Sequence, residues 1–536
     1  MLQSNCCFVW EDTLTTRTIS AKPVRRGSFV SNLIGNGASF GVTLVVGVWF
    51  TAYLVRNLGA ASYGLIPLAT AVASYMSVLT SALTSSVGRA ITVADGAGDH
   101  AEVQRVFNAA FFGCMLFSLA LLPCALFGAY LAPEFLSVPD GYESQARVLF
   151  AASGLVFLLT TASTPYGVAL FCRNRLDLSS SLNAGMTLLR VGVVCILFQL
   201  TVPGLWQVAA GLLLAAGLGA AASIAMSRRL MPELKVCWAN FTATTLRTLG
   251  ATGVWVSITQ FGTILLLSLD LLMVNLLLGA LAAGKYAIPL QLATLLRQVF
   301  TMLGGLFTPT IMSLYGSGQR DVLIAYVAKA IRFVGFLAAL AAGLICGFAS
   351  SLLTVWLGDD FAYLAPLVWV MIAPLAVNLA VFPMFGLALT VNKVRGPAVV
   401  TIVLGLVHVG LAWFLVERAG WGVYGVAASA ISLLSLKNLF YIPWYTARAV
   451  GMPTTALLAP VVSVGAATAV VWGIAVAVKM LLPVASWLSV FAVGGLAGCI
   501  AAVTIFFVFV DAASRVEVST LLRDKFRALL VAGPRA

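Results

Sequence analysis

Charged residues are scarce in this sequence. Only 9% of its 536 residues are Asp, Glu, Lys or Arg, while 61% are hydrophobic and the mean hydropathy is +1.03. A soluble domain carries roughly 25% charged residues, so this composition excludes a water-soluble protein and indicates a chain that has lipid as its solvent. Long polar stretches are also lacking, and we therefore expect no large domain outside the membrane.

Residue types that bind metals or cofactors are scarce too. His100 and His408 are the two histidines and cannot form a metal cluster; we expect His408, in an apolar segment, to be packed or singly hydrogen-bonded. The nine cysteines show no repeated spacing, which indicates neither a disulfide framework nor a metal site. A string resembling a phosphate-binding loop, Gly279 to Lys285, has Tyr286 where Ser or Thr should coordinate magnesium. We expect no cofactor and no ATP-hydrolysing domain.

Long apolar runs, by contrast, are abundant. A membrane-spanning helix needs about 20 apolar residues, and the sequence predicts fourteen such spans and hence an all-α polytopic membrane protein. The spans are expected at roughly 29–54, 64–86, 106–131, 146–170, 184–201, 204–226, 248–278, 285–314, 328–353, 363–390, 397–416, 422–445, 455–479 and 485–510. Prolines inside spans lack a backbone donor, which predicts kinks at Pro165, Pro289, Pro309 and Pro383.

One pattern of residues occurs twice, about 220 positions apart. Its members are Leu58-Gly59, Tyr63, Pro67 and Gly96 to Asp99 in the first copy, and Leu278-Gly279, Tyr286, Pro289 and Gly316 to Gln319 in the second. Six spans separate the copies, and an even number leaves both copies in the same orientation. Two matched bundles facing each other across a central cleft are therefore predicted. Such a cleft suits the movement of a solute.

The repeat divides the chain into two lobes of six spans with one extra pair of helices. The expected parts are a cytoplasmic N-terminal segment (1–28), an N-lobe (29–230), a cytoplasmic linker (231–247), a C-lobe (248–446), the extra pair (455–510) and a cytoplasmic tail (511–536). Between Ser514 and Leu530 the tail mixes apolar and basic residues in a way typical of an amphipathic helix on an anionic membrane surface. A frayed tail is the alternative.

The net charge of +13 raises the question of a nucleic-acid partner, but its distribution favours a membrane topology. With a cytoplasmic N-terminus, 24 of the 31 Lys and Arg residues lie in cytoplasmic segments, five on the opposite side and two within spans. Positive charge gathers in this way on the cytoplasmic side of membrane proteins. We therefore expect a multi-pass protein of the bacterial cytoplasmic (inner) membrane with both termini cytoplasmic, and no nucleic-acid partner.

One carboxylate, Asp270, lies well inside a span. A lone charge at that depth costs at least about 2.5–3.5 kcal/mol, so Asp270 should face a partner or a wet cavity. Arg297 in the next span is the candidate partner, because adjacent antiparallel helices place both at comparable depth. Gln260 and Asn275 share the span of Asp270, although the polar residues of this span do not form a single stripe. We interpret the group as a substrate or coupling-ion site; a structural ion pair within the C-lobe is the alternative.

Three further cations are candidates for contacting a phosphate. Arg89 and Arg190 lie near the cytoplasmic ends of the second and fifth spans, and guanidinium binds phosphate oxygens in a bidentate fork. The alternative for both is an Arg that extends to the membrane surface. Lys437 lies inside the twelfth span, where its side chain cannot easily extend to the membrane surface.

Several ordered motifs carry a resemblance to a known family. They are Leu58 to Gly64, Gly88-Arg89, Asp270, Leu278-Gly279, Tyr286, Thr308-Pro309, Tyr315-Gly316, Trp356 to Gly358, Asn392 to Arg395 and Trp421 to Ala427. In these motifs the chain resembles bacterial polysaccharide transporters, the lipid-linked oligosaccharide flippases of the multidrug/oligosaccharidyl-lipid/polysaccharide exporter superfamily. The match covers nearly the whole chain except its first 28 residues and its tail.

The resemblance implies twelve to fourteen helices in two lobes that form a V around a cationic cavity. It also implies movement of an undecaprenyl-diphosphate-linked glycan, with membrane lipids, a polysaccharide polymerase and other assembly proteins as partners. The first span lacks the tight arginine cluster of lipid II flippases, which favours an exopolysaccharide or O-antigen unit over a peptidoglycan precursor. Relatives in this superfamily use ion gradients, so alternating access driven by an ion is expected.

Three other functions are compatible with the sequence. A cation-coupled multidrug exporter of the same superfamily would have an acidic cavity, whereas Arg297 and Lys437 outnumber Asp270 within the spans. A membrane polymerase or ligase needs a large outer loop, and the longest one here is about 132–145. A scaffold within a polysaccharide-assembly complex is the third. We therefore expect the protein to be a transporter and not an enzyme.

Overall fold

The computed structural model describes residues 29–76, 98–173, 175–391 and 395–510, together with positions 78, 87, 88, 90–92, 94, 95, 393 and 515. All the regular structure in these residues is helical. Twelve helical stretches among the described residues are long and apolar enough to cross a membrane, and there are thirteen if the bent pair Ser257–Leu267 and Asp270–Leu278 is counted as one span. The predicted all-α membrane fold is confirmed. The N-terminal segment (1–28) and nearly all of the tail (511–536) lie outside the described residues.

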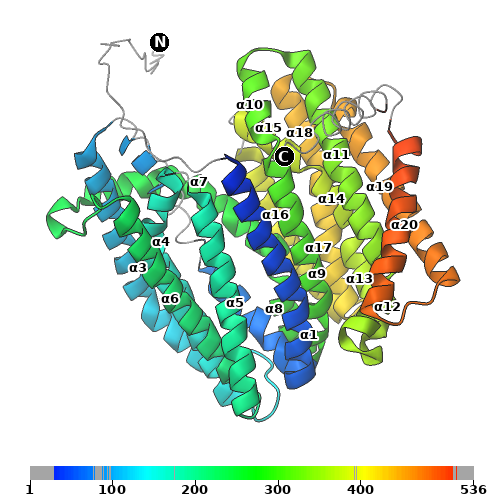
Figure 1. Ribbon diagram of the computed structural model, residues 1–536, viewed down its shortest axis with the longest axis horizontal. Coiled ribbons are helices and arrows are strands. Elements are labelled where there is room, and N and C mark those ends of the chain that lie inside the picture. Colours follow the sequence, from blue (N-terminus) through cyan, green and yellow to red (C-terminus); the bar gives the residue numbers. More distant parts are fainter. Residues whose placement is uncertain are drawn as a thin grey trace, which may run out of the picture.

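The helices form two lobes arranged as a V (Figure 1). Lobe one contains α1 (Phe29–Tyr75), α3 (His100–Phe135), α4 (Glu143–Cys172), α5 (Leu176–Leu200) and α6 (Leu205–Leu230). A short 3-10 turn, Trp238–Asn240, precedes the first helix of lobe two. The lobes diverge toward the end where α1 begins, at the top of Figure 1, and approach each other at the opposite end.

Lobe two has more and shorter helices than lobe one. They are α7 (Ala243–Leu267), α8 (Asp270–Leu278), α9 (Ala280–Gly305), α10 (Thr308–Gly316), α11 (Arg320–Gly347), α12 (Ala349–Leu357), the 3-10 helix η2 (Asp359–Leu364), α13 (Ala365–Ile372), α14 (Leu375–Ala380), α15 (Phe382–Thr390), α16 (Arg395–Glu417), α17 (Val423–Leu436), the π-helical turn η3 (Lys437–Tyr441) and α18 (Ile442–Val450). The extra pair, α19 (Thr454–Leu481) and α20 (Trp487–Val508), packs on the outside of this lobe, mainly through α19 against α11.

Prolines account for several of these breaks. Pro309 and Pro383 lie in the first turns of α10 and α15, and Pro374 directly precedes α14. Because proline has no N–H to donate, it is tolerated in the first turn of a helix but interrupts a longer one. The tenth expected span is therefore three consecutive short helices, α13 to α15.

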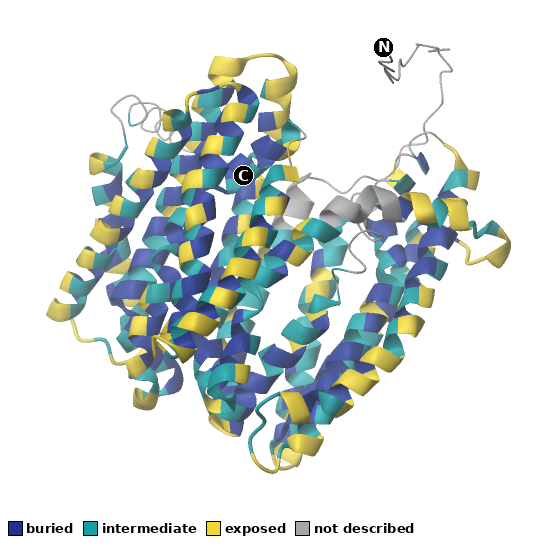
Figure 2. Ribbon diagram, turned by 180° about the vertical axis from the view of Figure 1, so that it is seen from behind, coloured by how far each residue is buried: buried dark blue, intermediate teal, exposed yellow. Residues whose placement is uncertain are grey.

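Apolar side chains are sorted as expected for a chain surrounded by lipid. Figure 2 shows buried residues inside each lobe and many exposed ones on the outer faces, where large side chains such as Phe127 and Phe491 are exposed. One continuous core joins the two lobes and includes Leu65 and Tyr286, whereas a separate core around Phe107 is built mainly from lobe one and also includes Leu249 of α7. The lobes thus share a dry interface at one end.

The Leu-Gly pair of the sequence repeat has the same backbone conformation in both copies. Gly59 and Gly279 have φ values of 76° and 87° and each interrupts the helical path between two spans. Glycine reaches positive φ without the steric cost that a side chain imposes. The spans on either side of Gly59 run together into α1, which contains the first expected span and the beginning of the second. Six spans separate each glycine from its counterpart, which supports a parallel repeat.

Gly64 and Gly284, also 220 positions apart, meet at the interface between the lobes. A Cβ on Gly64 would lie 2.6 Å from the Gly284 Cα, and one on Gly284 would clash with the carbonyl group of Ala60. Two helix backbones approach this closely only where side chains are absent, as is common between membrane helices. The second copy of the repeat therefore packs directly against the first.

We expect Gly284→Leu to separate the lobes at this end, because a side chain has no room between the two backbones and overpacking costs about 1–3 kcal/mol. Spin labels on Val202 and Leu281, both exposed, would report a longer distance than in the unsubstituted protein. Gly473→Leu is the matched control, since Gly473 has open space around its Cα. An unchanged distance in Gly284→Leu would show that the contact does not hold the lobes together.

Candidate functional site

A cavity of about 550 Å³ lies inside lobe two. Helices α7, α9 and α14 to α17 and the turn η3 supply its walls. The polar side chains that line it are Thr259, Gln260, Thr263, Arg297, Asn378, Thr401, Lys437 and Asn438. Two of these are cations, and none of the described residues that line the cavity is acidic. The cavity is therefore suited to an anion with additional hydrogen-bonding groups.

Lys437 opens the π-helical turn between α17 and α18. Its side chain is buried, its Nζ lies 3.3 Å from Thr401 Oγ1, and it approaches the ring of Phe385 at 6.0 Å. Among the described residues, no carboxylate lies within 4 Å of it. An ammonium group removed from water and left without a counter-ion is costly, and π-helical turns are frequent at functional sites. Lys437 is thus a strong candidate for ligand binding.

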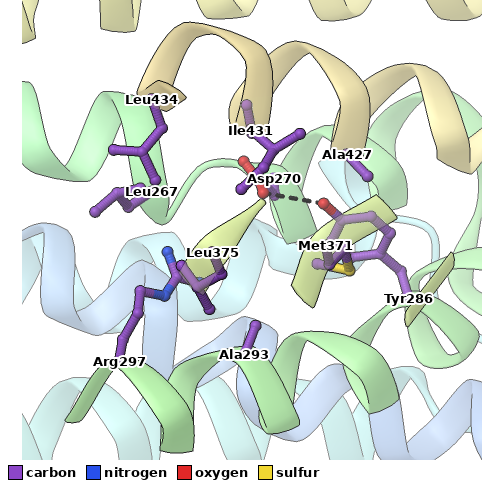
Figure 3. Close-up of a pocket in the computed structure, with 11 residues that line it drawn as sticks. Leu267, Asp270, Tyr286, Ala293, Arg297, Met371, Leu375, Ala427, Ile431 and Leu434 are labelled. Atoms are coloured by element: carbon purple, nitrogen blue, oxygen red, sulfur yellow. Dashed lines mark hydrogen bonds between the residues drawn. The ribbon is translucent and has the colours of Figure 1, made fainter. Parts of the chain in front are cut away.

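Arg297, on α9, lines two cavities at once. One is the large cavity, and the other is a water-sized space of about 30 Å³ that Asp270 and Tyr286 also line. Figure 3 shows the guanidinium group of Arg297 directed toward this smaller space. No hydrogen bond or ion pair within 4 Å joins it to another described side chain. The expected direct pair of Asp270 with Arg297 is therefore not formed.

Asp270 begins α8, directly after the 43° bend that separates α8 from α7. Its Oδ2 accepts a hydrogen bond from the Tyr286 hydroxyl at 2.9 Å (Figure 3). Its Oδ1 lies 3.0 Å from Nε2 of His408, whose Nδ1 lies 2.7 Å from the hydroxyl oxygen of Ser429. Asp270 is 5% exposed and His408 0%. His408 is packed, as expected, but it is not singly bonded, because this side chain has a polar partner on each ring nitrogen.

Asn275 does not reach either cavity. Its side-chain amide accepts from the backbone N–H of Ser137 and donates to the carbonyl oxygen of the same residue, both at 3.0 Å. Ser137 follows α3 in lobe one, so this pair joins the two lobes. A second contact runs from lobe one to lobe two: Arg56, near the end of the first span, donates to the carbonyl oxygen of Trp356 on α12 at 3.1 Å. We call these two contacts the interlobe clasp; Asn275 belongs to it and not to a substrate site.

Arg190 lies in a separate cavity of about 470 Å³ within lobe one. Helices α4, α5 and α6 line this cavity, with polar side chains at Thr160, Ser163, Asn183, Thr187, Arg190 and Ser223. The Nε of Arg190 is buried without a hydrogen-bond partner in the described part of the chain, and the guanidinium carbon lies 5.8 Å from the centre of the Phe50 ring. Phe50 stands nine residues before Gly59, just as Asp270 stands nine before Gly279.

The structure thus groups Gln260, Arg297 and Lys437 in the large cavity. Asp270 lines only the small space that it shares with Arg297, and Arg190 and Asn275 lie elsewhere. Arg89 lies outside the described residues. Sequence reasoning missed Asn378, whose amide donates to Ser435 at 2.9 Å, and Asn438, whose amide donates to Asn378 at 3.1 Å. The sequence signal that could have identified them is an amide side chain inside an apolar span. The bent chain at Pro374 and the π-helical turn bring them together.

Similar proteins are known for most of the length of this chain. The model of a family described as "Polysaccharide biosynthesis protein" matches residues 28–314. The "Uncharacterized membrane protein EpsK" of Bacillus subtilis (strain 168) is 34% identical over 467 residues, which cover 87% of this chain and 92% of the relative.

Two solved structures have a similar fold. The first is the lipid II flippase MurJ in an inward closed conformation, with a TM-score of 0.60, 13% identity and coverage of 89% of this chain and 99% of that one. The second is an inward-facing multidrug resistance transporter of the MATE family, with a TM-score of 0.57, 16% identity and coverage of 79% and 98%. At such low identity these likenesses concern the fold alone.

Proposed function

Because this chain belongs to the polysaccharide biosynthesis protein family and has the two-lobed fold of membrane transporters, we propose that it is a flippase. Its substrate is a polyprenyl-diphosphate-linked oligosaccharide, the repeat unit of an exopolysaccharide or O-antigen. The protein carries this substrate across the cytoplasmic membrane by alternating access of the two lobes.

The observation that carries the proposal is the cationic cavity of lobe two. A sugar-diphosphate head cannot cross hydrocarbon unless protein groups replace its water. Arg297 offers a planar fork for phosphate oxygens and Lys437 a compact positive charge, and both line this cavity. The amide groups of Gln260, Asn378 and Asn438 suit sugar hydroxyls. Acidic groups, which would repel a diphosphate, do not occur among the described lining residues.

Both lobes contribute to substrate binding in this proposal. The diphosphate head binds in the lobe-two cavity while the prenyl chain stays in lipid between the lobes. Arg190, whose buried Nε has no hydrogen-bond partner among the described residues, is a second cation for the head as the lobes rock. With the termini cytoplasmic, the diverging end of the V faces the cytoplasm, where lipid-linked glycans are made. A polymerase and other assembly proteins on the outer side would take up the product.

The test is transfer of a fluorescent prenyl-diphosphate disaccharide across proteoliposomes that contain the purified protein. We expect transfer only when the protein is present, and about tenfold slower transfer for Lys437→Gln, because a hydrogen bond to a charged group contributes about 1.5–3 kcal/mol. Arg418→Gln, an exposed cation outside both cavities, is the control and should transfer at the unsubstituted rate. Equal rates with and without protein would contradict the proposal.

The same vesicles separate the flippase from a multidrug exporter. A fluorescent lipophilic cation should not be transported, because Arg297 and Lys437 repel it from the cavity. Transport of the cation, without transfer of the diphosphate, would reassign the protein to drug export.

A further inference from the structure

Arg297 stands between two possible partners. On one side is the large cavity with Lys437, and on the other the small space that it shares with Asp270. A guanidinium group on a flexible side chain can turn toward whichever side offers the stronger negative charge. The charge state of the Asp270 site therefore bears directly on what Arg297 can bind.

His408 and Ser429 allow the Asp270 site to take up a proton without rearrangement. The Ser429 hydroxyl oxygen lies 2.7 Å from Nδ1 of His408 and 3.0 Å from the carbonyl oxygen of Val426, so it can donate to either. With neutral imidazole, Nε2–H donates to Asp270 and Ser429 donates to Nδ1. With imidazolium, both ring nitrogens donate and Ser429 turns its proton to Val426. Every polar group has a partner in both states.

The two states differ by one full charge. The carboxylate with imidazolium is neutral as a pair, whereas the carboxylate with neutral imidazole carries a net charge of −1. Asp270 and His408 are both buried, where a net charge is costly unless a counter-ion is near. Arg297 shares a cavity with Asp270 and is the cation placed to neutralise it.

We propose that Asp270 and His408 form a proton-binding site that controls Arg297. With the proton bound, the pair is neutral and Arg297 is free for an anion in the large cavity. When the proton leaves, Asp270 attracts Arg297 across the small space, and the guanidinium group of Arg297 no longer binds the anion. Binding of the proton therefore favours binding of the anion at this site. The anion part of this inference rests on the proposed function, and the proton part does not.

Other ionisable groups around the site fit this assignment. Tyr286 of α9 already donates to Asp270, and Tyr75 of α1 donates to the carbonyl oxygen of Ser268 at 2.8 Å. Lys437, beside α16 in the large cavity, is held by Thr401 of that helix. Among the described groups, this leaves His408 as the base and Arg297 as the mobile cation.

The proton part can be tested without any ligand, because the chain has only two histidines. Nuclear magnetic resonance of histidine-labelled protein in nanodiscs would follow both rings, and His100→Gln would identify the signal of His408. We expect Arg297→Gln to move the titration midpoint of His408 upward by about one pH unit, a roughly tenfold gain in proton affinity, because no cation then competes for Asp270. Asp270→Asn should move it downward by at least as much.

Arg418→Gln removes an exposed positive charge from the same lobe and is the control; it should leave the midpoint of His408 in place. A midpoint unchanged in Arg297→Gln would overturn the inference, whatever the protein transports. So would a His408 signal that does not titrate at any pH at which the protein stays folded.

The coupling to the anion is tested with farnesyl diphosphate. We expect its dissociation constant to rise about tenfold between pH 5.5 and pH 8 in the unsubstituted protein, following the midpoint of His408. Asp270→Asn should bind it tightly and equally at both pH values, since the substituted site cannot attract Arg297. Weak, still pH-dependent binding in Asp270→Asn would overturn the coupling. Absence of binding at every pH would instead contradict the diphosphate ligand of the proposed function.

Discussion

Transfer of the lipid-linked glycan should fall by roughly 10²–10⁴-fold when Arg297 and Lys437 are both replaced by Gln. Each cation contributes about 1.5–3 kcal/mol as a charged hydrogen-bond donor, and 1.4 kcal/mol is a factor of ten. Because both line one cavity, a single diphosphate can engage both. Glutamine keeps polarity and much of the volume, so the cavity should persist while its charge is lost.

The readout is surface polysaccharide in cells that lack the native protein and express the variant, together with the vesicle assay. The amount of inserted protein must match the unsubstituted level. Replacing Arg190 instead tests whether lobe one supplies a contact of its own, because its cavity is separate from that of lobe two. Normal polysaccharide in the double variant would remove the lobe-two cavity from the mechanism.

Asn275→Ala is expected to open the clasped end of the molecule. The substitution leaves the backbone N–H and carbonyl oxygen of Ser137 without partners. A buried polar group that loses its hydrogen bond costs about 1–3 kcal/mol. Because Ser137 is only half-buried, the clasped state should lose about 2 kcal/mol, the lower end of this range for two groups, relative to an opened state in which water reaches Ser137 freely. A shift of that size moves a two-state population by about 30-fold.

Spin labels on Val202 and Leu281 would report this change as a longer distance population. Asn57→Ala is the matched control, because the amide of Asn57 bonds only within its own helix, to the carbonyl oxygen of Tyr53. Arg56→Gln, on the other side of the clasp, should show the same direction of change, since Arg56 donates to Trp356. A distribution unchanged in Asn275→Ala would mean that packing around Gly64 and Gly284 is sufficient.

Most of the fold could be predicted from the sequence because the determining signals are local. Apolar runs of spanning length gave the helices, and the pairs Gly59/Gly279 and Gly98/Gly318 gave the repeat; all four glycines have positive φ. Prolines also gave the breaks at Pro309 and Pro383, but breaks without a proline could not be predicted from local signals. The π-helical turn at Lys437 and the bend between α7 and α8 depend on packing against other helices.

The site was predicted in part, for reasons that particular residues make clear. Arg297 and Lys437, which line one cavity, were candidates from the sequence because a charge inside an apolar span is rare and costly. The partner of Asp270 was missed because His408 lies 138 positions away, on α16, and no local pattern joins them. Asn275 was misassigned because a buried amide can hold two helical lobes together as readily as it can contact a ligand.

Phe50 and Asp270 occupy the same position in the two halves of the repeat, nine residues before Gly59 and Gly279. Both halves keep the same backbone at Gly59 and Gly279, and in both a tyrosine hydroxyl reaches the preceding span: Tyr63 to Thr51, and Tyr286 to Asp270. Only the second half has a carboxylate at this position, whereas the first has an aromatic ring close to the guanidinium group of Arg190. The two halves are thus alike in backbone and different in charge, so an ionisable contact at this position exists in one lobe alone.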